Sequence, residues 1–444
     1  MKAHLTMALS ILFVYPSAAL AQSLDECLTL ARAHAPRLRV AEAGISRADQ
    51  AIREARAALS PTLRLGAGFT QFSEPQRVVF PIPGSSGTQT IKTGSASALD
   101  VRTDLQVPVT TGGRDRSLVR AAEAVHAGQV HGREQAESDL VLHVSQAFYR
   151  LLAADRLQVA ADEAMASARA HRATSAARVR AGVAPRLDSL QAQVDLERRV
   201  SVVVRAREAA RLARIELETE MGATLDSTRT PIEPGPPTTP EPVAAAEAIE
   251  RALQSRPDLA TVDEALRENT WRLAAARAGG RPQVTLTATV QYAGPNRDED
   301  LWNLADPGLK TYRLFGGVGL SMPLFDGGLV RARVGELTAD RAALEARRAD
   351  SRLVIRREVE QALADARVAL TLWQSDSSRV AAAREALRLA DAGYKGGTVT
   401  GTEVRDAESA LADARAEEAE SLMDYWSAQA ALEHAIGHAS RRER

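Results

Sequence analysis

Two acidic side chains, Glu403 and Asp406, are the clearest candidates for a functional site in this 444-residue sequence. They lie three positions apart in a segment with helical periodicity, and residues with that spacing share one face of a helix. A pair of carboxylates on one face attracts cations. Such a pair is most often a solvated acidic face, so its role depends on the elements around it.

No group of residues has the spacing that is typical of an enzyme. The eight histidines are scattered, Cys27 is the only cysteine, and "GAGFTQ" at Gly66 lacks the third glycine of a dinucleotide-binding loop. No serine, cysteine or metal-ligand set has a usable spacing. We therefore predict a protein without catalytic activity, cofactor or bound metal.

The composition favours slender helical bundles. Hydrophobic residues make up 45% of the chain but aromatic residues only 4%, and alanine is the largest contributor to the hydrophobic share. Alanine-rich helices bury little area per residue and pack closely. The formal net charge of -1 leaves no electrostatic footprint for nucleic acid, which we exclude as a partner.

The N-terminus has the features of a secretory signal peptide, predicted to cover residues 1–21. Lys2 precedes an apolar run from Leu5 to Val14, and Ala19-Leu20-Ala21 fits a small-x-small cleavage site. The run is too short to anchor the chain in a bilayer, so we expect a mature chain that begins near Gln22, outside the cytoplasm. Cys27 follows about six residues later without a lipid-attachment context, which disfavours acylation.

The sequence is internally duplicated. "VPVTTGG" at 107–113 recurs as "MPLFDGG" at 322–328, and the same offset of 215 carries Gly182 onto Gly397. The register holds without insertion over about 115 residues, and helices packed side by side cannot absorb insertions without shifting every later side chain. We predict two laterally packed repeats, 22–222 and 243–438, with a Pro-rich linker at 223–242 and a tail at 439–444.

Each repeat has the same predicted order of elements: a helix of about 35 residues, two strands, a long helix and a return helix. The expected ranges are about 24–59, 61–73, 97–109, 115–181 and 184–221 in the first repeat, and 243–278, 283–293, 312–324, 329–396 and 399–436 in the second. Each long helix would measure about 100 Å at 1.5 Å per residue, about as much as two of the shorter helices end to end. The segments between the paired strands are expected to be surface loops.

The strand-like runs alternate apolar with polar or glycine residues, as in Leu63, Leu65, Ala67 and Phe69. Their length of about ten residues suits a tilted membrane strand, although a half-buried soluble sheet is an open alternative. No later segment has 18 consecutive apolar residues, so a membrane location would require strands. Since four strands cannot close a barrel and lipid does not tolerate open sheet edges, several chains would have to combine.

Both long helices end in matching turns. "RVRAGVAPRLDSLQAQ" at 178–193 and "GYKGGTVTGTEVRDAE" at 393–408 each have a basic residue two places before a glycine and an acid six places after it. The pairs are Arg180 and Lys395, Gly182 and Gly397, and Asp188 and Glu403. A turn between helices often requires a left-handed residue, which accounts for the glycines locally.

The chain resembles the TolC-like outer membrane efflux protein family of Gram-negative bacteria. The motifs that carry the resemblance are these two turns, the "VPVTTGG" and "MPLFDGG" junctions, and "APRL" and "RPDL" at Pro36 and Pro257. The resemblance covers essentially the whole mature chain in the expected order. It implies an α+β membrane protein: a trimeric 12-stranded transmembrane β-barrel, with four strands per chain, continued by a long periplasmic α-helical coiled-coil tunnel.

The resemblance also implies a function and partners. The homotrimer would lie in the outer membrane as the passive exit duct of a tripartite export system, docked to a periplasmic adaptor protein and an inner-membrane pump of the RND, ABC or MFS type. The alternative from another class is a soluble periplasmic coiled-coil adaptor or structural protein. The transported substrate is not readable from the sequence.

Site residues follow from the resemblance position by position. Gly182 and Gly397 match the tips that contact the adaptor, and Glu403 and Asp406 match a constriction that three chains would line with two acidic rings. Tyr394 and Asp188 match positions that hydrogen-bond across neighbouring tip helices in the closed state, so Tyr394→Phe is predicted to raise conductance. Val399 stands where related proteins have an arginine that forms a second closing link.

Overall fold

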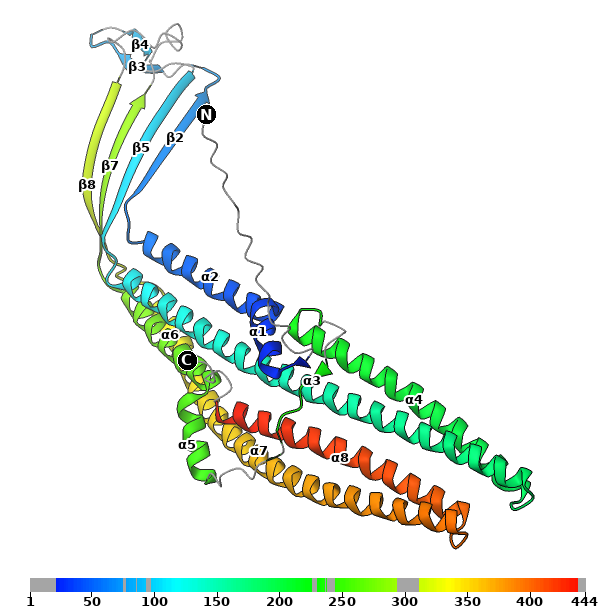
Figure 1. Cartoon of the computed structure of the whole chain (residues 1–444). Coiled ribbons are helices and arrows are strands. Elements are labelled where there is room, and N and C mark those ends of the chain that lie inside the picture. Colours follow the sequence, from blue (N-terminus) through cyan, green and yellow to red (C-terminus); the bar gives the residue numbers. More distant parts are fainter. Residues whose placement is uncertain are drawn as a thin grey trace, which may run out of the picture. The chain divides into compact units, whose positions relative to one another are not determined.

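The computed structural model describes residues 21–74, 77–84, 86–92, 97–225, 230–235, 237, 244–293 and 311–437 (Figure 1). The signal peptide predicted for 1–21, apart from Ala21, and the tail predicted for 439–444 lie outside the described residues. The chain divides into two compact units. One comprises 1–42, 132–257 and 351–444, and the other comprises 43–131 and 258–350.

The described elements repeat in order along the chain. The helices are α1 (Leu24–His34), α2 (Pro36–Ala57), α3 (Arg114–Arg180), α4 (Arg186–Met221), α5 (Ala245–Ser255), α6 (Pro257–Ala278), α7 (Leu329–Gly396) and α8 (Gly401–Ile436). The strands are β1 (Ala21–Gln22), β2 (Thr62–Gln71), β3 (Arg77–Pro81), β4 (Thr88–Lys92), β5 (Ser97–Thr110), β6 (Thr230–Pro231), β7 (Gln283–Ala293) and β8 (Thr311–Ser321). Thus α1 to α4 with β2 and β5 correspond to α5 to α8 with β7 and β8.

The first helix of each repeat is divided in two, and the expectation of one continuous helix was wrong. The breaks fall at Ala35 (φ -58°, ψ 123°) and Arg256 (φ -73°, ψ 125°), each directly before a proline. The proline ring clashes with a helical conformation of the preceding residue, so that residue becomes extended and the helix restarts at the proline.

The return helices α4 and α8 end on equivalent glycines that each touch the first helix of their own repeat. Gly222 and Gly437 have φ of +68° and +83°. A Cβ on Gly222 would lie 2.9 Å from the His34 carbonyl oxygen, and one on Gly437 would lie 2.5 Å from Ser255 Oγ. Both the left-handed conformation and the close approach therefore require glycine.

A hydrophobic core of the unit that contains the helix tips joins α1, α3 and α4. Its fully buried side chains include Cys27, Leu140, Val144, Phe148, Leu217 and Met221. Burial raises the pKa of the Cys27 thiol to about 12, so this thiol stays protonated and packs as a small apolar side chain.

A polar cluster next to this core makes the stability of the protein depend on pH. Asp139 Oδ1 lies 2.8 Å from His434 Nε2 and accepts a hydrogen bond of 2.8 Å from Gln135 Nε2. Burial raises the pKa of the Asp139 carboxyl, but the hydrogen bond and the charge of His434, with Gln135 and His143, outweigh burial and leave this pKa below its usual range. The stabilisation is therefore present above the pKa of Asp139 in the unfolded chain and is lost as pH falls through the lower folded value.

We expect Asp139→Asn to lower the free energy of unfolding by about 1 kcal/mol at neutral pH. Thermal unfolding followed by circular dichroism from neutral to acidic pH measures this difference between the wild type and the variant. The difference in stability between the wild type and the variant should shrink as pH falls, because the wild-type carboxylate then becomes protonated. A difference that is independent of pH would contradict the assignment.

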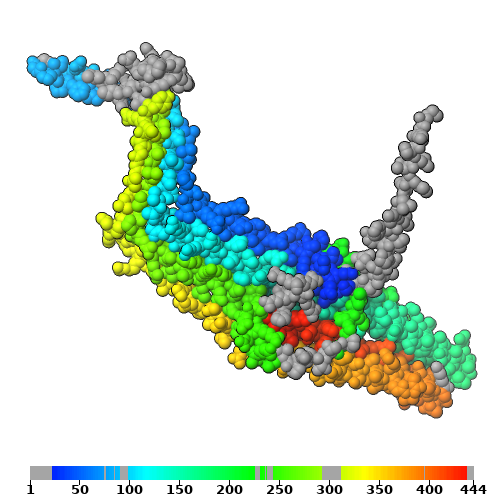
Figure 2. Space-filling view, turned by 60° about the vertical axis from the view of Figure 1, so that its left-hand side comes forward, coloured from blue at the N-terminus to red at the C-terminus, as the bar shows by residue number. Residues whose placement is uncertain are grey.

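Four long strands form one antiparallel sheet in the order β2-β5-β7-β8. Figure 2 shows them side by side, yellow-green at β8 and β7, cyan at β5 and blue at β2. The register places Leu65, Thr103, Val290 and Leu314 in one row and Gly66, Arg102, Gln291 and Arg313 in the next. Because successive side chains alternate between the faces, one face is almost wholly apolar, while the other carries mainly polar residues and glycine, with Phe315 as its one large apolar side chain among the paired residues.

The apolar face of the sheet is uncovered within the chain. Leu65 is 76% exposed, Leu314 78%, and Val318 71%. Strands β2 and β8 each pair on one side only among the described residues, so both sheet edges are open. An exposed apolar face and two open edges require an apolar surrounding and further strands from outside this chain.

Two segments expected to lack strands contain them. The predicted loop between β2 and β5 holds the hairpin of β3 and β4, in which Val79 pairs with Thr90; the β-branched and aromatic run Val78-Val79-Phe80 favours strands, and Gly84 (φ +85°) lies in the turn. In the predicted Pro-rich linker, β6 pairs in parallel with β1. Proline is tolerated there because β6 is a short edge strand.

Candidate functional site at the helix tips

The two helix-to-helix turns lie at the same end of their unit in both views (Figures 1 and 2). Gly182 has φ +73° and Gly397 has φ +77°. In the first turn, Gly182 N donates to Val179 O at 3.0 Å, and Val183 N donates to Arg178 O at 3.1 Å. The second turn repeats this pattern: Gly397 N donates to Tyr394 O at 3.2 Å, and Thr398 N donates to Gly393 O at 2.9 Å. The glycines thus end α3 and α7 with the same capping geometry.

Space around the tip glycines is open. A Cβ on either Gly182 or Gly397 would meet no described atom within 4 Å. Glycine is therefore required there by the left-handed backbone and not by packing within the chain. The exposed side chain of Val183 adjoins the first glycine, with 65% of its surface accessible, so the tip presents backbone and apolar surface to its surroundings.

Glu403 has a structural role in addition to its predicted place in a gate. Its Oε2 accepts from Thr400 N at 2.7 Å and from Thr400 Oγ1 at 2.9 Å, while Glu403 N donates to Thr400 Oγ1 at 3.3 Å. This capping box starts α8. The hydrogen bond from the Thr400 backbone, and then the one from its side chain, lower the pKa of the Glu403 carboxyl, so it is ionised at neutral pH.

Thr400→Ala should lower the free energy of unfolding by about 1 kcal/mol, because it removes the side chain that caps α8. Chemical denaturation followed by circular dichroism measures this loss. The equivalent residue in the first turn, Pro185, makes no side-chain cap bond and provides the matched control: Pro185→Ala should cost less. Equal losses for both variants would contradict the cap.

Asp406 and Asp188 are less constrained than Glu403. Asp406 is exposed and Asp188 is half-buried. Within the part of the chain that the structure describes, neither carboxylate has a recorded hydrogen bond or ion pair. Neutral Gln191 follows Asp188 by three positions and accepts from Arg405 Nη1 at 3.4 Å, so the first turn lacks a second acid at this spacing.

Tyr394 is buried, at 8% exposure, and its ring is held by the other repeat. The Arg178 guanidinium carbon lies 4.6 Å from the ring centroid, and Arg178 Nη1 donates to Tyr394 O at 3.4 Å. The His171 ring lies 5.7 Å from the Tyr394 ring. Among the described side chains, none forms a hydrogen bond with the Tyr394 hydroxyl, and this includes Asp188 of the same chain.

Val399, which stands in place of an arginine, packs on its own turn. A Cβ added to Gly393 would clash with Val399 Cγ2, and Val399 N donates to Gly393 O at 3.3 Å. The side chain therefore folds back onto the end of α7 and makes no long-range polar link. Arg178, on α3, supplies the cation at this tip instead.

Polar contacts continue from Arg178 along the boundary between α3 and α8. Ser167 Oγ donates to Glu408 Oε1 at 2.6 Å, and Arg415 Nη1 pairs with Glu163 Oε2 at 2.6 Å. By contrast, α7 and α8 pack through apolar side chains of Val380, Leu411 and Ala414. Near the tips, polar contacts therefore join the two hairpins, whereas farther from the tips the Tyr149 ring on α3 stacks on Trp426 of α8.

Sequence reasoning missed Arg178 and His171. Arg178 belongs to the quoted turn motif, but its partner is 216 residues away, and no periodicity in the sequence links the two. The duplication places Gly393 and Ala386 at the positions equivalent to Arg178 and His171. Because neither residue type recurs in the second repeat, the duplication does not mark these positions.

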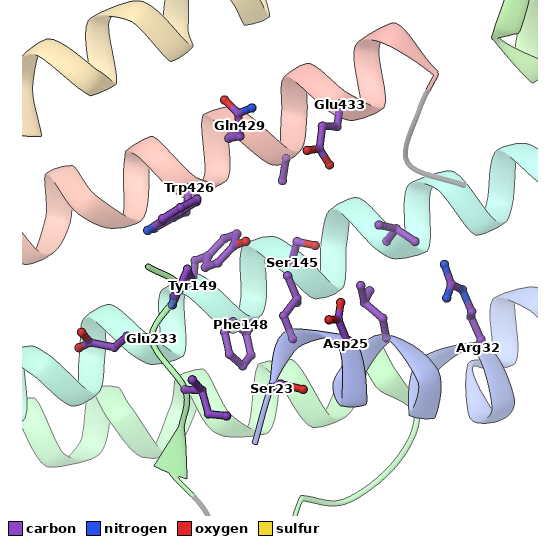
Figure 3. Close-up of a pocket in the computed structure, with 16 residues that line it drawn as sticks. Ser23, Asp25, Arg32, Ser145, Phe148, Tyr149, Glu233, Trp426, Gln429 and Glu433 are labelled. Carbon is purple, nitrogen blue, oxygen red and sulfur yellow. The ribbon is translucent and has the colours of Figure 1, made fainter. Parts of the chain in front are cut away.

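A second concave feature lies away from the tips, among α1, α3 and α8 (Figure 3). This cavity of about 300 Å³ is lined by the aromatic residues Phe148, Tyr149 and Trp426. Its Glu233 is ion-paired with Arg156. Its composition favours helix packing over reaction chemistry, and among the described residues no group of three His, Cys, Asp or Glu side chains could hold a metal ion.

Comparison with known proteins relates most of the chain to outer membrane efflux proteins. The family model described as outer membrane efflux protein matches residues 27–223 and 248–438. No protein of curated function matches the sequence. Among the described residues, no helix is both long and apolar enough to cross a membrane.

Solved structures share the fold. A membrane protein from Pseudomonas aeruginosa is 24% identical, with 93% of each chain covered and a TM-score of 0.74. The CmeC outer membrane channel of Campylobacter jejuni is 16% identical, with 94% of this chain and 86% of that chain covered and a TM-score of 0.77. The open state of the Neisseria gonorrhoeae MtrE outer membrane channel is 20% identical, with 95% and 90% covered and a TM-score of 0.73. The predicted fold class is confirmed.

Proposed function

The chain belongs to the outer membrane efflux protein family, and we propose that three copies form a passive exit duct of a tripartite export system. Each chain would give its four strands to a 12-stranded barrel, since the open edges of β2 and β8 are not tolerated in lipid. The apolar sheet face would then contact lipid, and the polar face would line the interior. The duct does no chemistry of its own.

The helix tips are the proposed gate and docking site. Glu403 and Asp406 line the narrow end as acidic rings that favour cations, and Asp188 of one chain faces Tyr394 of its neighbour. Arg178 adds a closing contact within each chain, because its bond to Tyr394 joins the first hairpin to the second. Opening would require the tips of the two hairpins to separate where the contacts between α3 and α8 are polar, while each hairpin stays intact.

The exposed turns at Gly182 and Gly397 are the proposed contact with a periplasmic adaptor, which connects the duct to an inner-membrane pump of the RND, ABC or MFS type. The single observation that carries the proposal is that two matched turns with open surroundings lie at one end of the helices. The chain also has a sheet with an uncovered apolar face, which suits contact with lipid. A soluble adaptor would not require the uncovered apolar sheet face.

Site-specific cross-linking in cells tests the docking. A photoreactive residue at Val183 or Thr398, each next to a tip glycine, should capture a periplasmic adaptor. The same residue at Val40 on α2, which is 73% exposed, is the control and should not capture it. Absence of an adaptor at both tips, or equal capture at Val40, would overturn the proposal; the captured adaptor would also identify the transport system.

A further inference from the structure

Three arginines lie on the polar face of the sheet, on three of its four strands. The register pairs Gly66 with Arg102, Arg102 with Gln291, and Gln291 with Arg313. Arg64 precedes Gly66 by two residues and shares its face, so it is a diagonal neighbour of Arg102. At a strand spacing of about 4.8 Å, the Cα atoms of Arg102 and Arg313 are about 10 Å apart. The three guanidinium groups therefore form one patch.

The acidic residues on this face do not balance the patch. Asp104 accepts from Thr289 Oγ1 at 2.7 Å and lies 4.0 Å from Arg102 Nε. Asp100 accepts from Gln291 Nε2 at 2.5 Å. Arg64 and Arg313 are exposed, and within the described residues neither has an ion pair. Three cations thus face two anions on each sheet: Asp104 lies opposite Arg64 and two residues from Arg102 on the same strand, whereas Arg313 lies opposite the neutral Gln291, so the patch keeps a net positive charge.

An exposed aromatic ring adjoins the patch. Phe315 lies two residues from Arg313 on the same face and is 54% exposed. The next residues on this face along β8 are Gly317 and Gly319, which add no side chain above the sheet. A large apolar ring on the polar side of a membrane sheet gains no contact with lipid, so it is available to an apolar group that approaches with an anion.

We propose that Arg64, Arg102, Arg313 and Phe315 form a binding patch for organic anions on the inner wall of the sheet. The guanidinium groups would hold a carboxylate, since the planar fork of arginine matches its geometry, and Phe315 would contact the apolar body. This inference rests on the proposed function in one respect: the duct places this face of the sheet toward a water-filled interior. Binding itself can be measured on the purified channel.

The test is binding of benzoate, acetate and benzylammonium to purified channel in detergent, by saturation-transfer NMR with empty micelles as the blank. Benzoate should bind more tightly than acetate, and benzylammonium should not bind. The double variant R64Q/R313Q should weaken benzoate binding about tenfold, and R64K/R313K should restore part of it. Phe315→Ala should reduce benzoate to the level of acetate.

The control is Gln106→Ala, an uncharged change on the same face, which should leave binding unaltered. Equal benzoate affinity in the wild type and R64Q/R313Q, or benzylammonium binding as tight as benzoate, would overturn the inference. The NMR measurement does not depend on docking at the tips. If no adaptor is captured at the tips but benzoate still binds, the proposed duct function is contradicted and the proposed anion-binding patch is not.

Discussion

Replacing Arg178 by glutamine is expected to shift the channel toward its open state. The substitution removes the cation above the Tyr394 ring and the bond to the Tyr394 carbonyl. A partly buried contact of this type contributes about 1 to 2 kcal/mol, so the ratio of open to closed channels should rise by about five- to thirtyfold. Planar-bilayer recordings of the purified channel measure this as higher mean conductance.

Two further variants separate the contact within the chain from the predicted link between chains. Tyr394→Ala removes the ring and should resemble Arg178→Gln. Tyr394→Phe keeps the ring over Arg178 and removes only the hydroxyl, so raised conductance in this variant would report the bond to Asp188 of a neighbouring chain. Arg172→Gln, at an exposed position on the same helix, is the control, and wild-type conductance in Arg178→Gln would refute the contribution of Arg178.

Neutralising both acids at the tip, in E403Q/D406N, should abolish most of the cation preference of the channel and its block by multivalent cations. Rings of carboxylates set the selectivity of cation pores because they concentrate cations at the narrowest point. Reversal potentials in asymmetric KCl, recorded from single channels, measure the change. Unchanged reversal potentials would refute the acidic constriction.

The charge of Glu403 must be separated from its capping role. Glutamine retains an oxygen that can accept from Thr400, whereas Thr400→Ala removes the cap and leaves the charge, so Thr400→Ala should reduce stability without altering selectivity. Asp413 lies seven residues beyond Asp406, on the same face of α8 and also exposed. Asp413→Asn should have a smaller effect than Asp406→Asn if the constriction lies at the tip.

Much of the fold could be predicted because helix and strand patterns are local. The offset of 215 between Gly182 and Gly397 reflects helices that cannot tolerate insertions. Alternation in "QVTLTATVQY" reflects the two-residue period of a strand. The errors were local as well: Ala35 and Arg256 break a helix because a proline follows each, a signal that was present in the sequence but was outweighed by the helical pattern around it.

The functional site could be predicted only in part. Tyr394, Glu403 and the tip glycines stand out through the duplication and the resemblance to a family. Arg178 and His171 could not be found in this way, because they contact Tyr394 across more than two hundred residues of chain. The arginine patch also needed the strand register, since Arg64, Arg102 and Arg313 are adjacent only once β2, β5, β7 and β8 are paired.

The repeat, the order of the long helices and strands, and the positions of the turns follow from the residue pattern alone, because each depends on neighbours within a few residues. The three-dimensional arrangement was needed to establish which side chains meet across the repeats: Arg178 above Tyr394, Glu403 committed to a helix cap, and arginines gathered on one face of the sheet. Those contacts depend on side-chain directions and strand register, which no local pattern in the sequence contains.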